Sequence, residues 1–421
     1  MPASDKTPSR WLIAIMGTLL QLCLGTVYAW SYFQKPLVDT YGWSNTQVAW
    51  AFSIAICSLG LAAAFGGLRL PRSGPRKLAV AGGLLFGLGY LLAALALHWK
   101  SLVLLYLGYG VIGGCGLGLG YVTPVATAAK WFPDKKGLVT GMVIMGFGFG
   151  ALLMSKVIAP LLMGFCHGNL VHVFALTGAV FLVLPAACGA WLRNPPPGYA
   201  PEGTPVAAPA PGAGVPLDTG TSGHLASGQF LMMWLVFFCN ILAGISIIGF
   251  QSPLFQDLWK RINPSLSGAT LAAYGATLIA ASSLFNGLGR LFWGGLSDRI
   301  GRALTFRIML ASQAFAFVVL MLAGNPWVFG AAICYVLLCY GGGFGTMPSF
   351  VLDIFGPRQM AVIYGTILTA WSAAGIAGPQ LVAVLKDRYG AEASVYAFAV
   401  GTVILAIGFV LSMRLSEKRR H

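Results

Sequence analysis

The feature that most constrains this chain of 421 residues is a series of long apolar runs. A bilayer core about 30 Å thick is crossed by about 20 consecutive apolar residues in an α-helix. The sequence contains twelve runs of this kind, at 11–33, 47–68, 78–97, 101–124, 138–163, 170–192, 229–255, 269–295, 304–323, 327–350, 360–384 and 393–413. They predict an all-α polytopic membrane protein.

The composition agrees with lipid as the main solvent of the chain. Hydrophobic residues make up 57% of it and charged residues only 9%, against about 25% charged residues in soluble proteins. The net charge of +15 does not indicate a nucleic-acid partner, because the basic residues fall in short loops and form no stripe with interleaved aromatic residues. Most of the eight cysteines lie within apolar runs without a CxxC pair, so no metal site is predicted.

The loop charges predict the orientation in the membrane. If the N-terminus is cytoplasmic, 18 of the 26 basic residues fall on the cytoplasmic side, seven on the other side, and Arg290 within a helix. Positive charge gathers in cytoplasmic loops. The first run is too long for a signal-peptide core and has no cleavage site, so we expect it to be retained. We therefore predict a multi-pass protein of the cell (inner or plasma) membrane with both termini cytoplasmic.

The chain divides into two similar halves. A Pro/Ala/Gly-rich tract cannot build a core and predicts a cytoplasmic linker at 194–228, between one six-helix bundle at 1–193 and another at 229–421. The turn GLRLPRSGPR in the first half resembles GGLSDRIGR in the second, with Gly74 opposite Gly301 and Pro71 opposite Asp298. A second echo pairs Pro124 with Pro348. Two bundles in parallel, pseudo-twofold repeat predict a cavity between them that opens alternately to each side.

Three stretches carry a family resemblance. GGLSDRIGR resembles the signature loop of the major facilitator superfamily, and KWFPDKKGLVTG, LFNGLGRLFWGGLSDRIGR and PSFVLDIFG are similar to the oxalate/formate antiporter family and its bacterial monocarboxylate transporter relatives. The resemblance implies the major facilitator fold. It also implies a gating role for the signature loop, with Gly294, Asp298, Arg299, Gly301 and Arg302. The acidic residue usual in the first-half loop is replaced here by Pro71.

Arg290 is the main candidate for substrate binding. A charge inside a membrane helix costs several kcal/mol and is usually functional, and its planar guanidinium matches a carboxylate through two hydrogen bonds. The alternative is a structural arginine that reaches the membrane interface. The resemblance places Arg290 at the family's carboxylate-binding arginine. Asn286, four residues earlier, lies on the same helix face. It stands where animal monocarboxylate transporters carry an aspartate that takes part in proton coupling, and asparagine does not titrate.

Aromatic residues complete the predicted site. By resemblance, Tyr28, Tyr121, Phe147, Tyr340 and Phe344 match positions that line the family's central cavity, although each could simply pack helices together. Trp371 stands where the oxalate transporter carries a lysine. With Arg290 as the one cation, we predict a monovalent carboxylate rather than a dicarboxylate.

The predicted function is secondary active transport of a small monocarboxylate such as lactate or pyruvate, coupled to protons. The alternatives are an anion exchanger of the oxalate/formate type and a carrier of another small compound. A membrane enzyme is disfavoured, because the five histidines lie at helix ends, in loops or at the tail. A sensor is disfavoured, because the linker and the short tail SEKRRH leave no room for a soluble signalling domain. We predict no catalytic residues, cofactor or metal, and a monomer whose partners are the carboxylate, protons and the lipid bilayer. Asp257 and Asp353 are candidates for a proton site.

Overall fold

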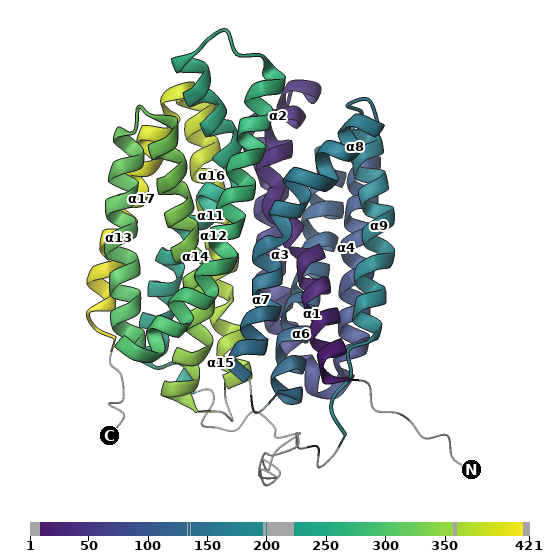
Figure 1. Cartoon of the computed structure of the whole chain (residues 1–421), viewed down its shortest axis with the longest axis vertical. Helices are drawn as coiled ribbons and strands as arrows, with labels where there is room; N and C mark the ends of the chain where they lie inside the picture. The colour runs from purple at the N-terminus through teal and green to yellow at the C-terminus, as the bar shows by residue number, and fades with distance from the viewer. Residues whose placement is uncertain are drawn as a thin grey trace.

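A computed structural model gives the structure of the chain and describes residues 9–132, 134, 136–196, 199, 223–356 and 360–415. Within these residues the secondary structure is helical, without β-strands. Figure 1 shows long helices that run side by side along the long axis of the molecule. Most of the predicted linker lies outside the described residues, so its form stays a prediction.

The helices of the first half coincide with the first six apolar runs. In chain order they are α1 (Arg10–Leu24), η1 (Gly25–Ala29), α2 (Trp30–Tyr41), α3 (Asn45–Ser73), α4 (Pro75–His98), α5 (Leu102–Leu105), η2 (Tyr106–Gly113), α6 (Gly114–Trp131), α7 (Lys136–Leu153), η3 (Met154–Ile158), α8 (Ala159–Phe165) and α9 (Leu170–Ala190). Several predicted runs are served by more than one element. The first crossing, for example, is built from α1, η1 and α2.

The second half repeats this plan. Its elements are α11 (Gly228–Ile262), α12 (Gly268–Ile300), α13 (Arg302–Leu322), α14 (Pro326–Phe355), α15 (Met360–Ile367), α16 (Thr369–Tyr389), η4 (Gly390–Glu392) and α17 (Ala393–Ser412). Among the residues that the structure describes, eleven helical stretches are long and apolar enough to cross a membrane, and the last, Val362–Ser412, has 51 residues. It contains α16 and α17, which pack against each other after the chain turns at Gly390 (φ +56°). The twelfth predicted crossing is therefore contained in this stretch.

The halves lie next to each other, the first purple to teal and the second green to yellow in Figure 1. They meet along two seams that carry hydrogen bonds, α3 with α15 and α16 and α7 with α12, and along a further contact of α2 with α11. Small residues allow this close approach: a Cβ added to Gly148 would lie 2.6 Å from the Cα of Gly287. On each seam a second-half serine donates to a first-half carbonyl, Ser283 to Gly148 at 2.5 Å and Ser372 to Cys57 at 2.8 Å.

The two equivalent turns have the same backbone shape. Gly74, between α3 and α4, has φ 74° and ψ 160°, and Gly301, between α12 and α13, has φ 95° and ψ 153°. This region of backbone conformation is essentially restricted to glycine. The similarity between the two turns in sequence is therefore matched by a similarity in backbone conformation.

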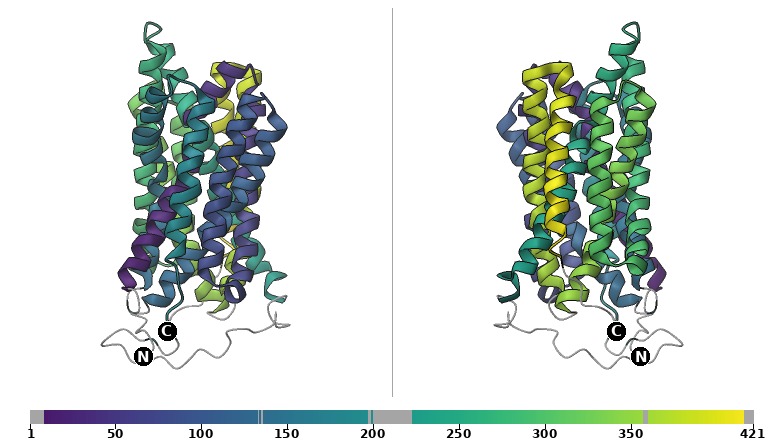
Figure 2. Two further views of the ribbon diagram at one scale, coloured as in Figure 1. Left: turned by 90° about the vertical axis from the view of Figure 1, so that its right-hand side faces the viewer. Right: turned by 90° about the vertical axis from the view of Figure 1, so that its left-hand side faces the viewer.

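Helix α1 begins and α17 ends at the same end of the molecule, the lower end in Figures 1 and 2. We call this the inner end, and the opposite end, where α2 finishes and α3 begins, the outer end. The predicted cytoplasmic position of the inner end stays a prediction.

Candidate functional site

Arg290 lies on α12 in the middle of the molecule, facing the first half. Its side chain is buried, with 3% of the residue exposed. Its Nη1 donates to the backbone carbonyl of Ile144 at 3.2 Å and, more weakly, to the hydroxyl of Tyr121 at 3.5 Å. Both partners belong to the first half and both are neutral. Among the described residues no carboxylate forms an ion pair with Arg290.

Two nitrogens of the guanidinium, Nε and Nη2, are buried without a hydrogen-bond partner. These two N–H groups point in the same direction and form the edge that binds a carboxylate through two parallel hydrogen bonds. A buried charged group left unpaired costs free energy. The structure thus presents a planar, cationic edge that no described protein group pairs with, inside the predicted membrane region.

Six aromatic residues surround the guanidinium and form what we call the aromatic cage. Neighbouring rings of the cage lie with centroids 4.6–6.4 Å apart. The carbon Cζ of Arg290 lies 5.2 Å from the ring centre of Phe344 and 5.8 Å from that of Phe147. The first half contributes Tyr28, Tyr121 and Phe147, and the second half contributes Tyr340, Phe344 and Trp371. All six are residues that the sequence analysis selected.

The cage is closed in this structure. Each of its rings is at most 2% exposed, so the side chains fill the space that they enclose. A hydrogen bond of 2.6 Å joins the hydroxyls of Tyr28 and Tyr340 across the two halves. A substrate therefore reaches Arg290 only when the halves move apart.

Asn286 lies one helical turn before Arg290 and is also buried, with 1% exposed. Its Oδ1 has no hydrogen-bond partner. A Cβ added to Gly341 of α14 would lie 2.9 Å from this oxygen, which places the side chain beside that helix. Its role toward a substrate stays a prediction.

The signature loop of the second half is tied together by Arg302. Its guanidinium donates to Asp298 at 2.5 Å, to Asp353 at 3.2 Å, to the carbonyl of Gly294 at 3.4 Å, and to the hydroxyl of Ser297. The Arg302 side chain is only 8% exposed. These contacts join the end of α12, the start of α13 and the end of α14 within one half, while Arg299 remains exposed.

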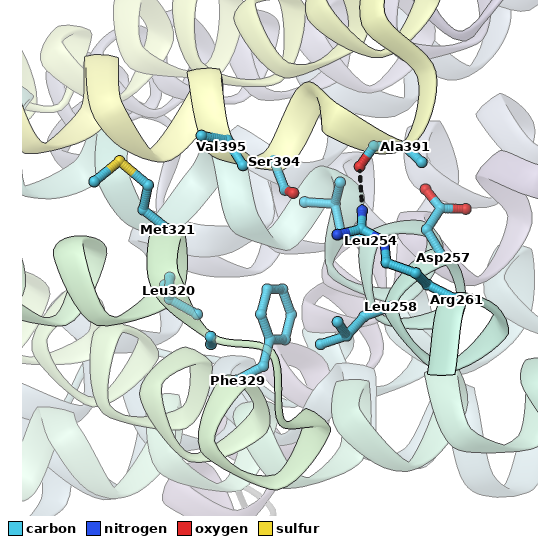
Figure 3. A pocket seen from close by; sticks show the side chains of 11 residues that line it. Leu254, Asp257, Leu258, Arg261, Leu320, Met321, Phe329, Ala391, Ser394 and Val395 are labelled. Carbon is cyan, nitrogen blue, oxygen red and sulfur yellow. Dashed lines mark hydrogen bonds between the residues drawn. The ribbon is translucent and has the colours of Figure 1, made fainter. Parts of the chain in front are cut away.

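The two acids considered for proton coupling are already paired and lie away from the cage. Asp353 accepts from Arg302 at the inner end, and Asp257 pairs with Lys386 at the outer end. Asp257 also borders a cavity of about 40 Å³, together with Arg261 and Phe329 (Figure 3). In that view Arg261 donates to the carbonyl of Ala391 at 3.0 Å. This cavity holds little more than water and lies within the second half.

Two contributors to the site were missed in the sequence. Ile144 acts through its backbone carbonyl, which no sequence pattern marks. Tyr364 on α15 is buried and lies near the Tyr121 hydroxyl. The sequence did hold one signal for Tyr364. Its neighbour Gly365 repeats Gly141 of the first half at the same spacing at which Pro348 repeats Pro124.

Comparisons with known proteins decide the family. A family model described as Major Facilitator Superfamily matches residues 11–379. The chain belongs to the Major Facilitator Superfamily. Its superfamily fold has two six-helix bundles, as the sequence predicted, and its members are transporters.

Individual relatives extend over most of the chain. It is similar to the oxalate:formate antiporter of Oxalobacter formigenes, at 27% identity over 94% of this chain and 92% of the relative. It is also similar to apicoplast pyruvate carrier 1 of Toxoplasma gondii, at 26% identity over 100% and 93%. A solved bacterial homologue of the human lysosomal transporter Spinster, inward-facing and occupied, matches with a TM-score of 0.68 over 97% of each chain. At 16% identity this last likeness concerns the fold alone.

Proposed function

We propose that this superfamily member is a secondary active transporter of a small monocarboxylate such as lactate or pyruvate. The observation that carries the proposal is the free Nε–Nη2 edge of Arg290, buried and enclosed by the aromatic cage. One carboxylate fits this edge with two charge-assisted hydrogen bonds. The two relatives are named for oxalate, formate and pyruvate, which supports the same substrate class.

The rest of the cage limits the size and charge of the substrate. Tyrosine hydroxyls of Tyr28, Tyr121 and Tyr340 can donate to a second oxygen, such as the hydroxyl or keto group next to a carboxylate. Trp371, wholly buried in the cage, is neutral and bulky. In the described part of the cage Arg290 is the one cation, so a second carboxylate would have no counter-charge. A dicarboxylate should bind poorly.

Within this proposal, the coupling mode is proton symport. The second candidate is anion exchange, which one observation favours. Because Arg290 has no acidic partner among the described residues, the empty closed protein buries an uncompensated charge, and that is costly. A bound anion removes this cost, so closure and reorientation should be faster with substrate than without it.

The test is uptake of labelled lactate by the purified protein in liposomes. Uptake is measured with an inward proton gradient and, separately, into liposomes preloaded with unlabelled lactate. Symport predicts gradient-driven accumulation without internal anion, and exchange predicts uptake only into preloaded liposomes. We expect Arg290→Ala to lower uptake by about two orders of magnitude, since it removes charge-assisted hydrogen bonds in a dry site. Arg290→Lys should also be impaired, because an ammonium cannot reproduce the two-point geometry.

Arg76→Ala is the matched control, since this arginine is exposed at the start of α4. Oxalate added as a competitor should inhibit more weakly than pyruvate. If neither lactate nor a panel of other small carboxylates is taken up in either mode, the proposed substrate class is wrong. The proposal also includes a monomer in the cell membrane with the inner end toward the cytoplasm.

A further inference from the structure

The outer end holds a carboxylate that bridges the two halves. Asp387, near the end of α16, accepts three hydrogen bonds from the start of α3: from the backbone N–H of Asn45 at 2.8 Å, from the Asn45 side-chain amide at 3.0 Å, and from the backbone N–H of Thr46 at 2.8 Å. The ion pairs between described residues Arg10–Asp134, Lys35–Asp39, Arg302–Asp298, Arg302–Asp353 and Lys386–Asp257 each stay within one half. Asp387 instead joins the two halves.

The start of α3 needs these bonds. The first N–H groups of any helix have no partner inside the helix. In α3, the Ser44 side chain caps the N–H of Gln47, and the Gln47 side chain accepts from the N–H of Ser44. That capping box leaves the N–H groups of Asn45 and Thr46, and Asp387 accepts from both. A negative charge is also favoured at the positive end of a helix dipole. The second half thus supplies a cap that the first half lacks.

The neighbouring charges do not compete for Asp387. Lys386, the preceding residue, pairs with Asp257 of α11, and Arg261 of α11 donates to the carbonyl of Ala391. Arg388 lies over the ring of Tyr389, with Cζ 6.0 Å from the ring centre. Glu392 is exposed on η4.

Further inter-half bonds follow the same seam inward from Asp387. Gln380 donates to Ser53 at 3.3 Å, and Ser372 donates to the carbonyl of Cys57 at 2.8 Å. Residue numbers rise along α3 as they fall along α16, which shows that the two helices pack antiparallel. Further inward, α15 packs against α3, and the described residues of these two helices form no hydrogen bond with each other. Hydrogen bonds therefore join the halves in the outer part of this seam and not in its described inner part.

We infer that Asp387 is the outer latch of the transporter, a positioning residue that holds the α3–α16 seam closed at the outer end. Opening the cage to the outside must break its three bonds and expose the start of α3. Opening to the inside separates α15 from α3, where the described residues share no hydrogen bond, and leaves the latch in place. The latch rests on the alternating movement that the proposed function requires, but it can be tested without any substrate.

The readout is Ser53→Cys, placed on a residue that is fully buried under the latch. A membrane-impermeant maleimide is added to one side of the reconstituted protein and then to the other, and labelling at position 53 is measured by peptide mass spectrometry. We expect Asp387→Ala to raise outer-side labelling at least tenfold. Asp387→Asn, which keeps one acceptor oxygen but no charge, should give an intermediate rise.

Asn45→Pro tests the same contact from the other half. Proline is favoured at the first position of a helix, and Ser44 already has the extended backbone that must precede a proline (φ −70°, ψ 159°). The variant therefore keeps α3 but removes two of the three donors. It should raise labelling as Asp387→Ala does, and the double variant should add little to either.

Asp39→Asn is the control, because this exposed carboxylate pairs only with Lys35 in its own half; labelling should not change. Equal labelling in the parent, Asp387→Ala and Asn45→Pro proteins would overturn the latch, even if lactate uptake behaved as proposed. Increased labelling together with an absence of carboxylate uptake would uphold the latch and reject the proposed substrate.

Discussion

The turn between α3 and α4 and the turn between α12 and α13 share a backbone but not a set of contacts. Gly74 and Gly301 have nearly the same dihedral angles. In the second half, Arg302 is buried and binds two aspartates. In the first half the equivalent positions are Pro71 and Pro75, and the remaining basic residues Arg69, Arg72, Arg76 and Lys77 are exposed.

The central site shows the same asymmetry. The second half supplies its charge, through Arg290, together with Asn286. The first half supplies neutral groups: three rings of the cage and the carbonyl of Ile144. The two halves share one fold but contribute differently to the site. The second half supplies the charged side chain, and the first half supplies the neutral groups that pack against it. Fold symmetry alone would not reveal this division.

Removing an arginine from each turn is the strongest test of whether the ionic contacts distinguish the two turns. Arg302→Ala removes the ionic contacts of this guanidinium with Asp298 and Asp353. We expect a loss of about 2–3 kcal/mol of stability, below the range for fully buried pairs because Asp298 is 63% exposed. Arg72→Ala should leave stability unchanged. Thermal unfolding in detergent checks both variants. Equal unfolding midpoints would show that the second turn gains nothing from its ionic contacts.

Because the two turns share a backbone conformation, substitution of their glycines should lower stability equally, unlike substitution of their arginines. Gly74→Ala and Gly301→Ala each force a side chain into a conformation that costs about 1–3 kcal/mol. Nothing lies within 4 Å of a Cβ added at Gly74, so strain rather than crowding is the cause there. Both variants should lower the unfolding midpoint by similar amounts. A loss at Gly301 alone would mean that the first turn relaxes and that the resemblance between the turns is superficial.

The fold could be predicted from the sequence because membrane-spanning helices are recognised by their length and their apolar composition. All twelve runs matched helical segments, with soft ends: the run at 11–33 continues to Tyr41 as α2. Arg290 was predicted as a charge inside a membrane helix, the aromatic residues were predicted from the family resemblance, and the structure brings Arg290 and the six aromatic residues together. The contacts made by backbone groups, at Ile144 and at the start of α3, could not be predicted from the sequence, because they depend on how the two halves pack together. Asp387 carried no motif, and only its position opposite Asn45 identifies it.

The last comparison concerns position 286, one helical turn before Arg290, where this chain has asparagine and no acid. Asn286→Asp places a carboxylate four residues before Arg290, a spacing at which opposite charges pair on a helix. The aspartate would occupy the guanidinium in the empty protein and compete with the substrate. We expect lactate uptake at neutral pH to fall about tenfold, equivalent to about 1.4 kcal/mol of binding.

Lowering the pH should restore that uptake, because a protonated aspartate releases Arg290 to the substrate anion. The measurement is the pH dependence of labelled lactate uptake in liposomes, and Asn286→Leu is the neutral control of similar volume. Uptake is expressed relative to the parent at the same pH, so that the pH dependence of proton symport itself cancels. This ratio should rise as the pH falls for Asn286→Asp and stay constant for Asn286→Leu. If Asn286→Asp transports like the parent at every pH, Arg290 is not available as a carboxylate site, and the division of charge between the halves does not govern binding.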